Sequence, residues 1–286
     1  MKADNRVVVV GAGGLLGSTF VAALKDGPAL LTLGRADLAA ALPTQALDTI
    51  RSFSPTVLIN CAADTNVETA EDRPLEVFRT NALLPGLLAR VCRRANARIV
   101  HFSSTGCYGN WKSEPYDDFD RLEPTTVHHR AKLAGEHEVQ SSGADCLILR
   151  VGWLFGGVAR RDFVHARIRE ASGKTEIASD PSQIGCPTFA KDVVAQTLTL
   201  LEHDLAGVFN CVALEPVSRF EYVQKILDIA GSTTRLVPRA FVRRAPVSPN
   251  ESAVNTKLNL LGVNRMRPWQ DALADYLVAG GGGEPP

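Results

Sequence analysis

Three short groups of residues have types and spacings that could do chemistry. The first is a glycine-rich stretch, Gly11-Ala-Gly-Gly-Leu-Leu-Gly17, of the kind that lets a backbone approach a phosphate. The second is Ser103-Ser104-Thr105, whose hydroxyl groups can hydrogen-bond a substrate carbonyl. The third is His128 with Lys132, four residues later, a spacing that puts both side chains on one face of a helix.

The elements that must position these groups follow from the hydrophobic pattern. Short β-branched runs alternate with helix-length amphipathic segments, which predicts an α/β fold with a Rossmann-like, doubly wound parallel sheet. In such a sheet, ligands bind at the carboxyl ends of the strands, where the glycine stretch and Ser103-Ser104-Thr105 lie. We expect strands near residues 6–10, 29–33, 56–60, 98–102 and 145–150, and helices near 15–25, 45–53, 81–95 and 129–141.

After residue 150 the pattern loosens. We interpret residues 1–150 as the dinucleotide-binding Rossmann domain and residues 151–279 as a smaller C-terminal substrate-binding region. A helical pattern near residues 192–202 is expected to pack back on the Rossmann domain. The low-complexity tail over residues 280–286 (GGGGEPP) is expected to be disordered.

The glycine stretch predicts a dinucleotide cofactor, because it directly follows the first strand and precedes the first helix. Gly11, Gly14, Leu15 and Leu16 are the expected contacts, and the alternative is a tight turn without a ligand. After the second strand, Arg35 stands where an acidic residue usually binds the ribose 2′-hydroxyl. A guanidinium matches a 2′-phosphate, so NADP(H) is preferred, with NAD(H) as a second cofactor. The alternative for Arg35 is a solvated surface side chain.

Composition excludes several function classes. The 286 residues include 31 Lys plus Arg and 31 Asp plus Glu, so no net field attracts nucleic acid or an anionic membrane. No apolar stretch is long enough for a membrane helix. The six cysteines include no CxxC pair and no zinc-ligand spacing, which favours reduced thiols, no metal site and a cytoplasmic location.

The chain resembles the dTDP-4-dehydrorhamnose reductase family of the extended short-chain dehydrogenase/reductases. The individual motifs are short, but their order and spacing together are specific. The matching residues are Gly11, Gly14 and Gly17; Asn60-Cys-Ala-Ala-Asp-Thr-Asn-Val67; Asn81; Ser103-Ser-Thr105; Glu114-Pro-Tyr116; Lys132-Leu-Ala-Gly-Glu136; Leu149-Arg-Val-Gly-Trp153; and Asp180 to Thr188.

The resemblance implies hydride transfer from NADP(H) or NAD(H) to the C4 ketone of a nucleotide-linked 4-keto-6-deoxy sugar. A protein group then protonates the oxygen. Ser104 would hydrogen-bond that oxygen, and Lys132 would lower the pKa of the proton donor and hold the nicotinamide ribose. Further implied cofactor contacts are Cys61, Ala62, Ala63 and Asn81, and implied substrate contacts are Thr105, Tyr108 and Trp153. A homodimer is also expected.

The chain departs from the family at one catalytic position, because His128 replaces the tyrosine of the YxxxK motif. One interpretation is a reductase in which His128, or else Tyr108 or Tyr116, supplies the proton. Another is a related enzyme acting on a different nucleotide sugar. The last is a non-catalytic NADP(H)-binding partner, like the regulatory beta subunit of methionine adenosyltransferase. Tyr108 could also be purely structural, Trp153 could belong to the core, and His129 is expected to face solvent or a neighbouring helix.

Overall fold

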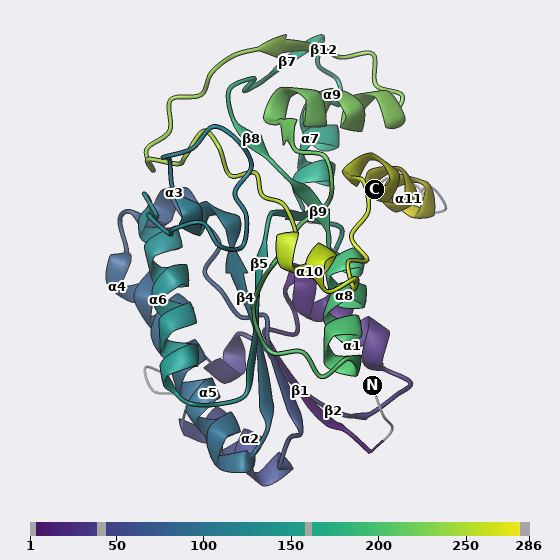
Figure 1. Cartoon of the computed structure of the whole chain (residues 1–286). Helices are drawn as coiled ribbons and strands as arrows, with labels where there is room; N and C mark the ends of the chain where they lie inside the picture. The colour runs from purple at the N-terminus through teal and green to yellow at the C-terminus, as the bar shows by residue number, and fades with distance from the viewer. Residues whose placement is uncertain (1–3, 39–43, 158–161, 281–286) are drawn as a thin grey trace.

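The computed structural model describes residues 4–38, 44–157 and 162–280 (Figure 1). Its centre is a six-stranded sheet in the order β10-β5-β4-β3-β1-β2, in which all neighbouring strands are parallel. The predicted doubly wound parallel fold is therefore confirmed. The strands of this sheet are β1 (Arg6–Val10), β2 (Ala29–Leu33), β3 (Val57–Asn60), β4 (Arg98–Ser104), β5 (Cys146–Val151) and β10 (Gly207–Cys211).

Both faces of the sheet are covered by helices, which explains the unbroken apolar sequence of β1. Val7 and Val9 point to one face and Val8 and Val10 to the other, and all four are fully buried. The first face is covered by α1 (Leu15–Leu24) and α8 (Ala190–Glu202). The second is covered by α2 (Thr44–Phe53), α5 (Leu84–Ala95) and α6 (Val127–Ser141).

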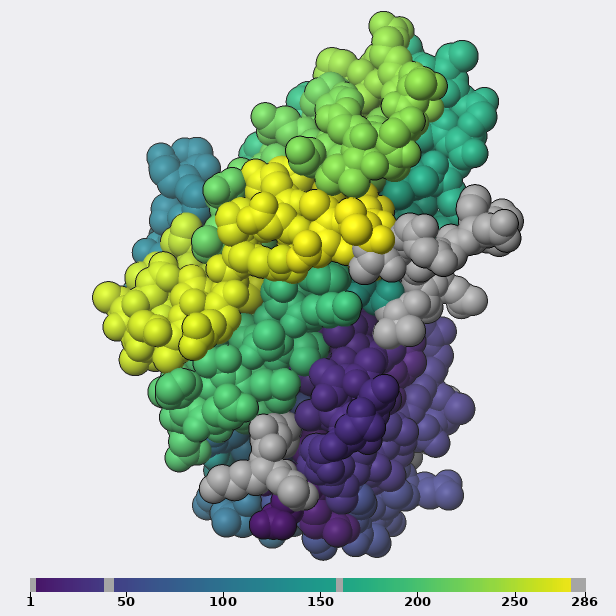
Figure 2. Space-filling model, turned by 90° about the vertical axis from the view of Figure 1, so that its right-hand side faces the viewer, coloured from purple at the N-terminus to yellow at the C-terminus, as the bar shows by residue number. Residues whose placement is uncertain are grey.

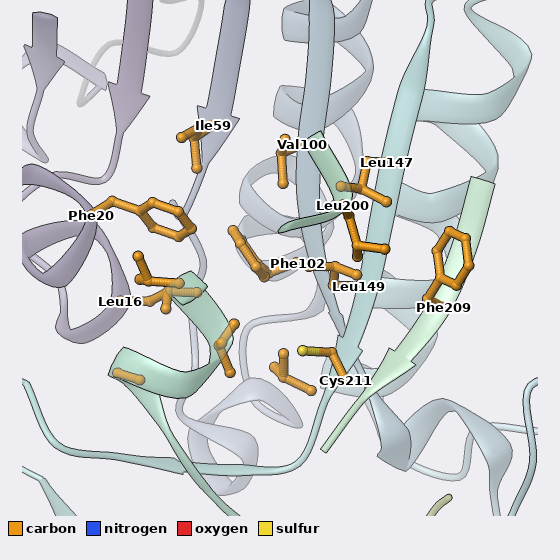
Figure 3. Close-up of a cluster of buried hydrophobic side chains, with 14 of the residues drawn as sticks. Leu16, Phe20, Ile59, Val100, Phe102, Leu147, Leu149, Leu200, Phe209 and Cys211 are labelled. Atoms are coloured by element: carbon orange, nitrogen blue, oxygen red, sulfur yellow. The ribbon is translucent and has the colours of Figure 1, made fainter. Parts of the chain in front are cut away.

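Aromatic rings fill the core beneath α1. Phe20 of α1 lies against Phe102 of β4 with ring centroids 5.6 Å apart, and Ile59 lies beside them (Figure 3). Towards the other edge, Leu149 of β5 and Phe209 of β10 continue the same cluster. This continuous apolar layer fixes the carboxyl ends of the strands relative to one another, and the candidate site lies at those ends.

Short helical elements connect the main ones. The helix predicted over residues 81–95 begins as a π-helical turn and becomes α-helical only at Leu84. Such turns insert one residue into the helical ladder and often occur at functional sites. The connecting elements are η1 (Ala36–Leu38), α3 (Val67–Ala70), α4 (Pro74–Phe78), the π-helical turn η2 (Arg79–Leu83) and η3 (Thr105–Tyr108).

The chain leaves the main sheet after β5 and forms a second region, seen above the sheet in Figure 1. Three small two-stranded sheets pair β6 with β9, β7 with β12 and β8 with β11. Their strands are β6 (Trp153–Phe155), β7 (Glu176–Ser179), β8 (Ile184–Gly185), β9 (Pro187–Phe189), β11 (Val217–Ser218) and β12 (Arg235–Pro238). The helices of this region are α7 (Phe163–Ala171), α9 (Arg219–Ile229), α10 (Thr256–Leu260) and α11 (Trp269–Gly280).

The chain returns twice to the main sheet after residue 150. Helix α8 covers one face beside α1, and β10 pairs in parallel with β5 as an edge strand. A boundary at residue 150 therefore marks where the chain first leaves the sheet, and later segments still contribute to it. Figure 2 shows the C-terminal segment, in yellow, lying across the molecule between the sheet helices and the α9 region. Of the predicted tail, Gly280 ends α11, and the rest lies outside the described residues.

Within the described ranges, no helix is long and apolar enough to cross a membrane. All six cysteines are free thiols, and four of them are buried.

Candidate active site

The glycine turn forms a cradle between β1 and α1. Gly11 has φ +79°, and a Cβ there would lie 2.6 Å from the backbone nitrogen of Ala62. A Cβ at Gly17 would lie 2.2 Å from the Gly11 carbonyl oxygen, so these two glycines let the turn close. Gly13 instead has open space around its Cβ position, and no side chain caps the N-terminus of α1 at Gly14. An uncapped helix N-terminus behind an open backbone surface fits a pyrophosphate.

The two segments beside this turn carry the other expected cofactor contacts. Cys61, Ala62 and Ala63 follow β3, and the Cys61 amide donates to the Val10 carbonyl at 2.8 Å. Arg35 follows β2 and is exposed; its carbonyl accepts from the Leu38 amide at 3.2 Å, and its guanidinium has no hydrogen bond or ion pair with a described residue. The structure thus brings the turn, residues 61–63 and Arg35 to one edge of the sheet.

One acidic residue near Arg35 was not predicted from the sequence to lie at the site. Asp37 lies in η1, and its Oδ2 accepts a hydrogen bond from the Gly34 amide at 2.7 Å. The carboxylate therefore stands at the end of β2 after all, two residues later than expected. An acidic residue directly after the strand would have been recognised. Here the order is Gly34-Arg35-Ala36-Asp37, so three residues separate Asp37 from the strand.

Asn81 supports the site from within the π-helical turn. Its Oδ1 accepts from the Asp64 amide and its Nδ2 donates to the Asp64 carbonyl, both at 2.8 Å. The same Nδ2 lies 3.4 Å from Nδ1 of His128. The side chain is fully buried with both polar groups hydrogen-bonded within the protein, and its expected cofactor contact stays a prediction. Asn81 holds the segment after β3 against helix α6.

His128 and Lys132 lie on the buried face of α6, as the spacing predicted. Burial, together with the neighbouring His129 and Lys132, lowers the pKa of His128 to about 3, so its imidazole is neutral. Lys132 donates from Nζ to the Phe102 carbonyl at the end of β4. Burial lowers the pKa of Lys132 to about 8, which leaves it mostly protonated at neutral pH. The site therefore holds one neutral ring and one readily deprotonated ammonium group.

Ser104 and Thr105 follow β4 at the same edge. Ser104 is half-buried, and its Oγ accepts from the Gly106 amide at 3.2 Å, which caps η3. Its own O–H has no acceptor among the described residues and is free to donate to a ligand. Thr105 is buried, which leaves Ser104 as the more accessible hydroxyl of the pair.

Tyr108 makes its contacts within the protein. The ring is fully buried, and its hydroxyl donates to Asn210 Oδ1 at 2.8 Å and accepts from Arg150 Nη1 at 3.1 Å. Arg150 in turn forms a buried ion pair with Glu136. Tyr108 is therefore part of a buried hydrogen-bond network, which favours the structural alternative over a substrate contact.

Tyr116 is likewise held by contacts within the protein. It is fully buried, and its hydroxyl donates to the Gly109 carbonyl at 3.1 Å. The backbone amide of Trp111 donates to the same hydroxyl oxygen at 3.2 Å. Among the aromatic candidates for the proton donor, this leaves His128.

Trp153 and His129 meet at a buried carboxyl group. Trp153 Nε1 donates to Glu251 Oε2 at 2.8 Å, and the other oxygen of Glu251 lies 3.7 Å from Nε2 of His129. His129 is only 4% exposed, so it does not face solvent; its ring lies against Gly106 of η3 and against His128. The contact with His129 could not be predicted from the sequence, because Glu251 is more than a hundred residues away along the chain.

A pocket lined by arginine side chains opens beside Trp153. Its volume is about 410 Å³, and Arg167, Arg219 and Arg243 line it together with Gln183 and Glu68. The Arg219 guanidinium lies 3.4 Å from the centroid of the Trp153 ring, which covers the indole and leaves less of it for a sugar. Arg219 forms no ion pair with a described residue, and burial lowers its pKa to about 10.

Arg243 pairs with Glu68 and Arg167 pairs with Glu170, so Arg219 is the lining guanidinium that has no ion pair with a described residue. No group of three or more His, Cys, Asp or Glu side chains in the described part of the chain is placed to hold a metal ion.

Comparison with known proteins agrees with this geometry. The family model described as RmlD substrate binding domain matches residues 5–280. A curated dTDP-4-dehydrorhamnose reductase of Mycobacterium tuberculosis is 32% identical, over 96% of this chain and 93% of that protein. A crystal structure of dTDP-4-dehydrorhamnose reductase from Bacillus anthracis in complex with NADP is 25% identical, with a TM-score of 0.92 over 96% of this chain and 99% of that one.

A second dTDP-4-dehydrorhamnose reductase structure, from Clostridium acetobutylicum, has the same identity, TM-score and coverage. The family model covers nearly the whole chain, both regions included. The likeness therefore extends from the glycine cradle to the arginine pocket. The chain belongs to the RmlD substrate binding domain family and is an oxidoreductase of the extended short-chain dehydrogenase/reductase type.

Proposed function

We propose that this protein is an NADP(H)-dependent reductase of a nucleotide-linked 4-keto-6-deoxy sugar, with His128 in the position of the family's catalytic tyrosine. The observation that carries the proposal is the meeting of three groups at one edge of the sheet. These are the open glycine cradle, the free O–H of Ser104, and the buried His128–Lys132 face of α6. The curated relatives named dTDP-4-dehydrorhamnose reductase support the substrate class.

The residues at this edge fit a phosphorylated dinucleotide. Gly13 and Gly14 offer backbone without side chains at the uncapped start of α1, and Arg35 offers a 2′-phosphate a guanidinium that pairs with no described residue. Asp37 offers carboxylate oxygens to ribose hydroxyls, which supports NAD(H) as a second cofactor. The related Bacillus anthracis enzyme was crystallised with NADP. When bound, NADP(H) supplies the hydride.

The chain's own groups stabilise the oxygen that becomes negatively charged during reduction. Ser104 donates its free O–H, and neutral His128 donates a ring N–H, so two donors meet the developing charge. A neutral imidazole is a weak acid, whereas the ammonium of Lys132, with a pKa of about 8, readily gives up a proton. We assign the net proton to Lys132 and the directional hydrogen bond to His128.

The arginine pocket supports the nucleotide part of the substrate. Arg167, Arg219 and Arg243 line a volume of about 410 Å³, in which Arg167 pairs with Glu170 and Arg243 with Glu68. One guanidinium group can donate hydrogen bonds to two phosphate oxygens at once, so a diphosphate fits this pocket. Phe163 and Phe241 add aromatic surface to its walls. The sugar then extends towards Trp153 and the Ser104 edge.

The deciding experiment is a single-turnover assay with NADPH and a dTDP-linked 4-keto-6-deoxy sugar, followed by the loss of NADPH absorbance. Stoichiometric oxidation of NADPH with formation of the C4 alcohol supports the proposal. The matched control is UDP-linked 4-keto-6-deoxy sugar, which separates the preferred nucleotide from a related activity. NADPH binding without turnover of either sugar contradicts the reductase and favours a non-catalytic partner protein.

A homodimer and a cytoplasmic location stay predictions. Light scattering tests the homodimer.

A further inference from the structure

We infer that His129 is a positioning residue that links the arginine pocket to the Ser104 turn. Its imidazole holds Gly106 on one side and faces Glu251 on the other. The inference rests on the proposed reductase function, but one arm of its test needs no turnover.

Thr126 fixes the orientation of the imidazole. Its Oγ1 accepts from the backbone amide of His129 and lies 3.1 Å from Nδ1 of the same residue. Burial lowers the pKa of His129 to about 4, so the ring carries one hydrogen at neutral pH. Because Nε2 faces a carboxyl oxygen of Glu251, we assign that hydrogen to Nε2, with Thr126 donating to Nδ1.

The imidazole fills the space that a side chain at position 106 would need. A Cβ on Gly106 would lie 2.2 Å from Cε1 and 2.3 Å from Nε2 of His129. The Gly106 amide donates to Ser104 Oγ, and Cys107 Sγ contacts the His129 carbonyl at 3.5 Å. The turn that orients the Ser104 hydroxyl therefore packs directly against His129.

On the opposite side, the contacts continue to the arginine pocket. Glu251 lies 3.7 Å from His129 and accepts a hydrogen bond from the indole of Trp153. The guanidinium of Arg219, which lines the pocket, covers that indole. Side chains from α6, β6 and α9, together with Glu251 in the loop before α10, thus form one continuous path from the pocket to the Ser104 turn.

This path predicts what losing His129 does. Without the imidazole, the η3 turn loses its support and the Ser104 hydroxyl shifts relative to the substrate oxygen. A misplacement of about 1 Å can cost about 10²-fold in rate. The glycine cradle and Arg35 make no contact with His129, so cofactor affinity is retained. The effect should therefore appear in kcat and leave the Kd for NADPH unchanged.

The first arm of the test measures kcat, KM and the Kd for NADPH in His129→Ala, Gly106→Ala and the double variant. We expect each single change to lower kcat by about 10²-fold, and the double variant to be no worse, because both disturb one contact. His129→Gln, a milder change, replaces His129→Ala if that variant unfolds. His137→Ala, exposed on the same helix, is the control. An unchanged kcat in His129→Ala, or additive losses in the double variant, overturns the inference.

The second arm measures the Kd for NADPH with and without thymidine 5′-diphosphate. If the pocket and the Ser104 edge are linked, the diphosphate changes the NADPH affinity of the parent by about fivefold or more. We expect this change to vanish in His129→Ala and in Glu251→Gln. The same change in parent and variants, or none in the parent, overturns the inference. A parent that reduces no keto sugar contradicts the proposed function alone, because this binding arm still decides the role of His129.

Discussion

Tyr108 and Tyr116 lie face to face, with ring centroids 4.9 Å apart and planes inclined by 5°. Both rings are fully buried, and both hydroxyls are hydrogen-bonded within the protein. Tyr108 comes from the loop after β4, and Tyr116 forms a β-bridge with Ala253. The stack therefore joins these two segments. Two of the three aromatic candidates for proton transfer thus have structural contacts. We therefore expect the proton transfer to take place at the face of α6 that carries His128.

Replacing His128 by alanine should lower the rate of keto-sugar reduction by about 10²-fold or more, because one donor to the developing oxyanion is lost. His128→Tyr restores the family's hydroxyl and should preserve or raise the rate. Pre-steady-state oxidation of NADPH measures both. His137→Ala, on the exposed face of the same helix, should match the parent. An alanine variant as fast as the parent would show that His128 does not contact the reacting oxygen.

The rate of reduction should fall as the pH rises through about 8, the value to which burial lowers the pKa of Lys132. The proton donor must be protonated, so each further pH unit should lower kcat by about tenfold. With the pKa of His128 near 3, no inflection belongs near pH 6.5. Lys132→Arg stays protonated and should be slower but flat across this range. An inflection near pH 6.5, present in the parent and lost in His128→Ala, contradicts this assignment.

Alanine substitutions in the glycine turn should separate binding from folding. Gly13→Ala meets no protein atom, and Gly14→Ala meets only the Gly11 carbonyl oxygen, at 3.3 Å. Both should weaken NADPH binding at nearly unchanged thermal stability. Gly17→Ala collides with the Gly11 backbone and should cost about 1–3 kcal/mol of stability. Calorimetric titration and thermal unfolding measure the two effects. Normal NADPH affinity in Gly13→Ala and Gly14→Ala would mean that the turn is structural only.

Removing the guanidinium of Arg35 should weaken NADPH binding by about tenfold or more, since a charge-assisted hydrogen bond to phosphate is lost. NADH lacks that phosphate, so its affinity should change by less than about twofold. Asp37→Asn should have the opposite preference and weaken NADH more. Arg265→Ala, an exposed arginine after α10, serves as the control. Equal losses for both cofactors in Arg35→Ala would contradict a 2′-phosphate contact.

Much of the sheet could be predicted because the signal is local. The apolar run at residues 6–10 and the amphipathic segments between strands report burial directly, and β1, β2 and α1 begin where the pattern predicts. Strand β10 could not be predicted in this way. Its residues, Gly207 to Cys211, contain no β-branched run like that of β1, and their pairing with β5 is a contact between distant segments. The π-helical turn at Asn81 was hidden because its composition is that of an ordinary helix.

The site shows the same division between local and distant information. The glycine turn and the His128–Lys132 spacing are local, and the structure places each where its helix geometry requires. The burial of His129 depends on Gly106 and on Glu251, which no window of sequence contains together. Adjacent residues of a helix point in directions about 100° apart. Since His128 was expected to point inward, this favoured an outward direction for His129. Packing against η3 overrides that expectation.

Strand β10 has a consequence for how the chain is synthesised. Until residue 211 has emerged from the ribosome, β5 remains the edge of the sheet, with its row of backbone amides and carbonyls unpaired. A fragment ending near residue 150 would present that open edge beside the apolar Leu147 and Leu149, a surface prone to pairing with other chains. We therefore expect a fragment ending near residue 150 to associate with other chains through β5. The six-stranded sheet is completed only by residues 207–211, after the chain has passed through β6, β9 and α8.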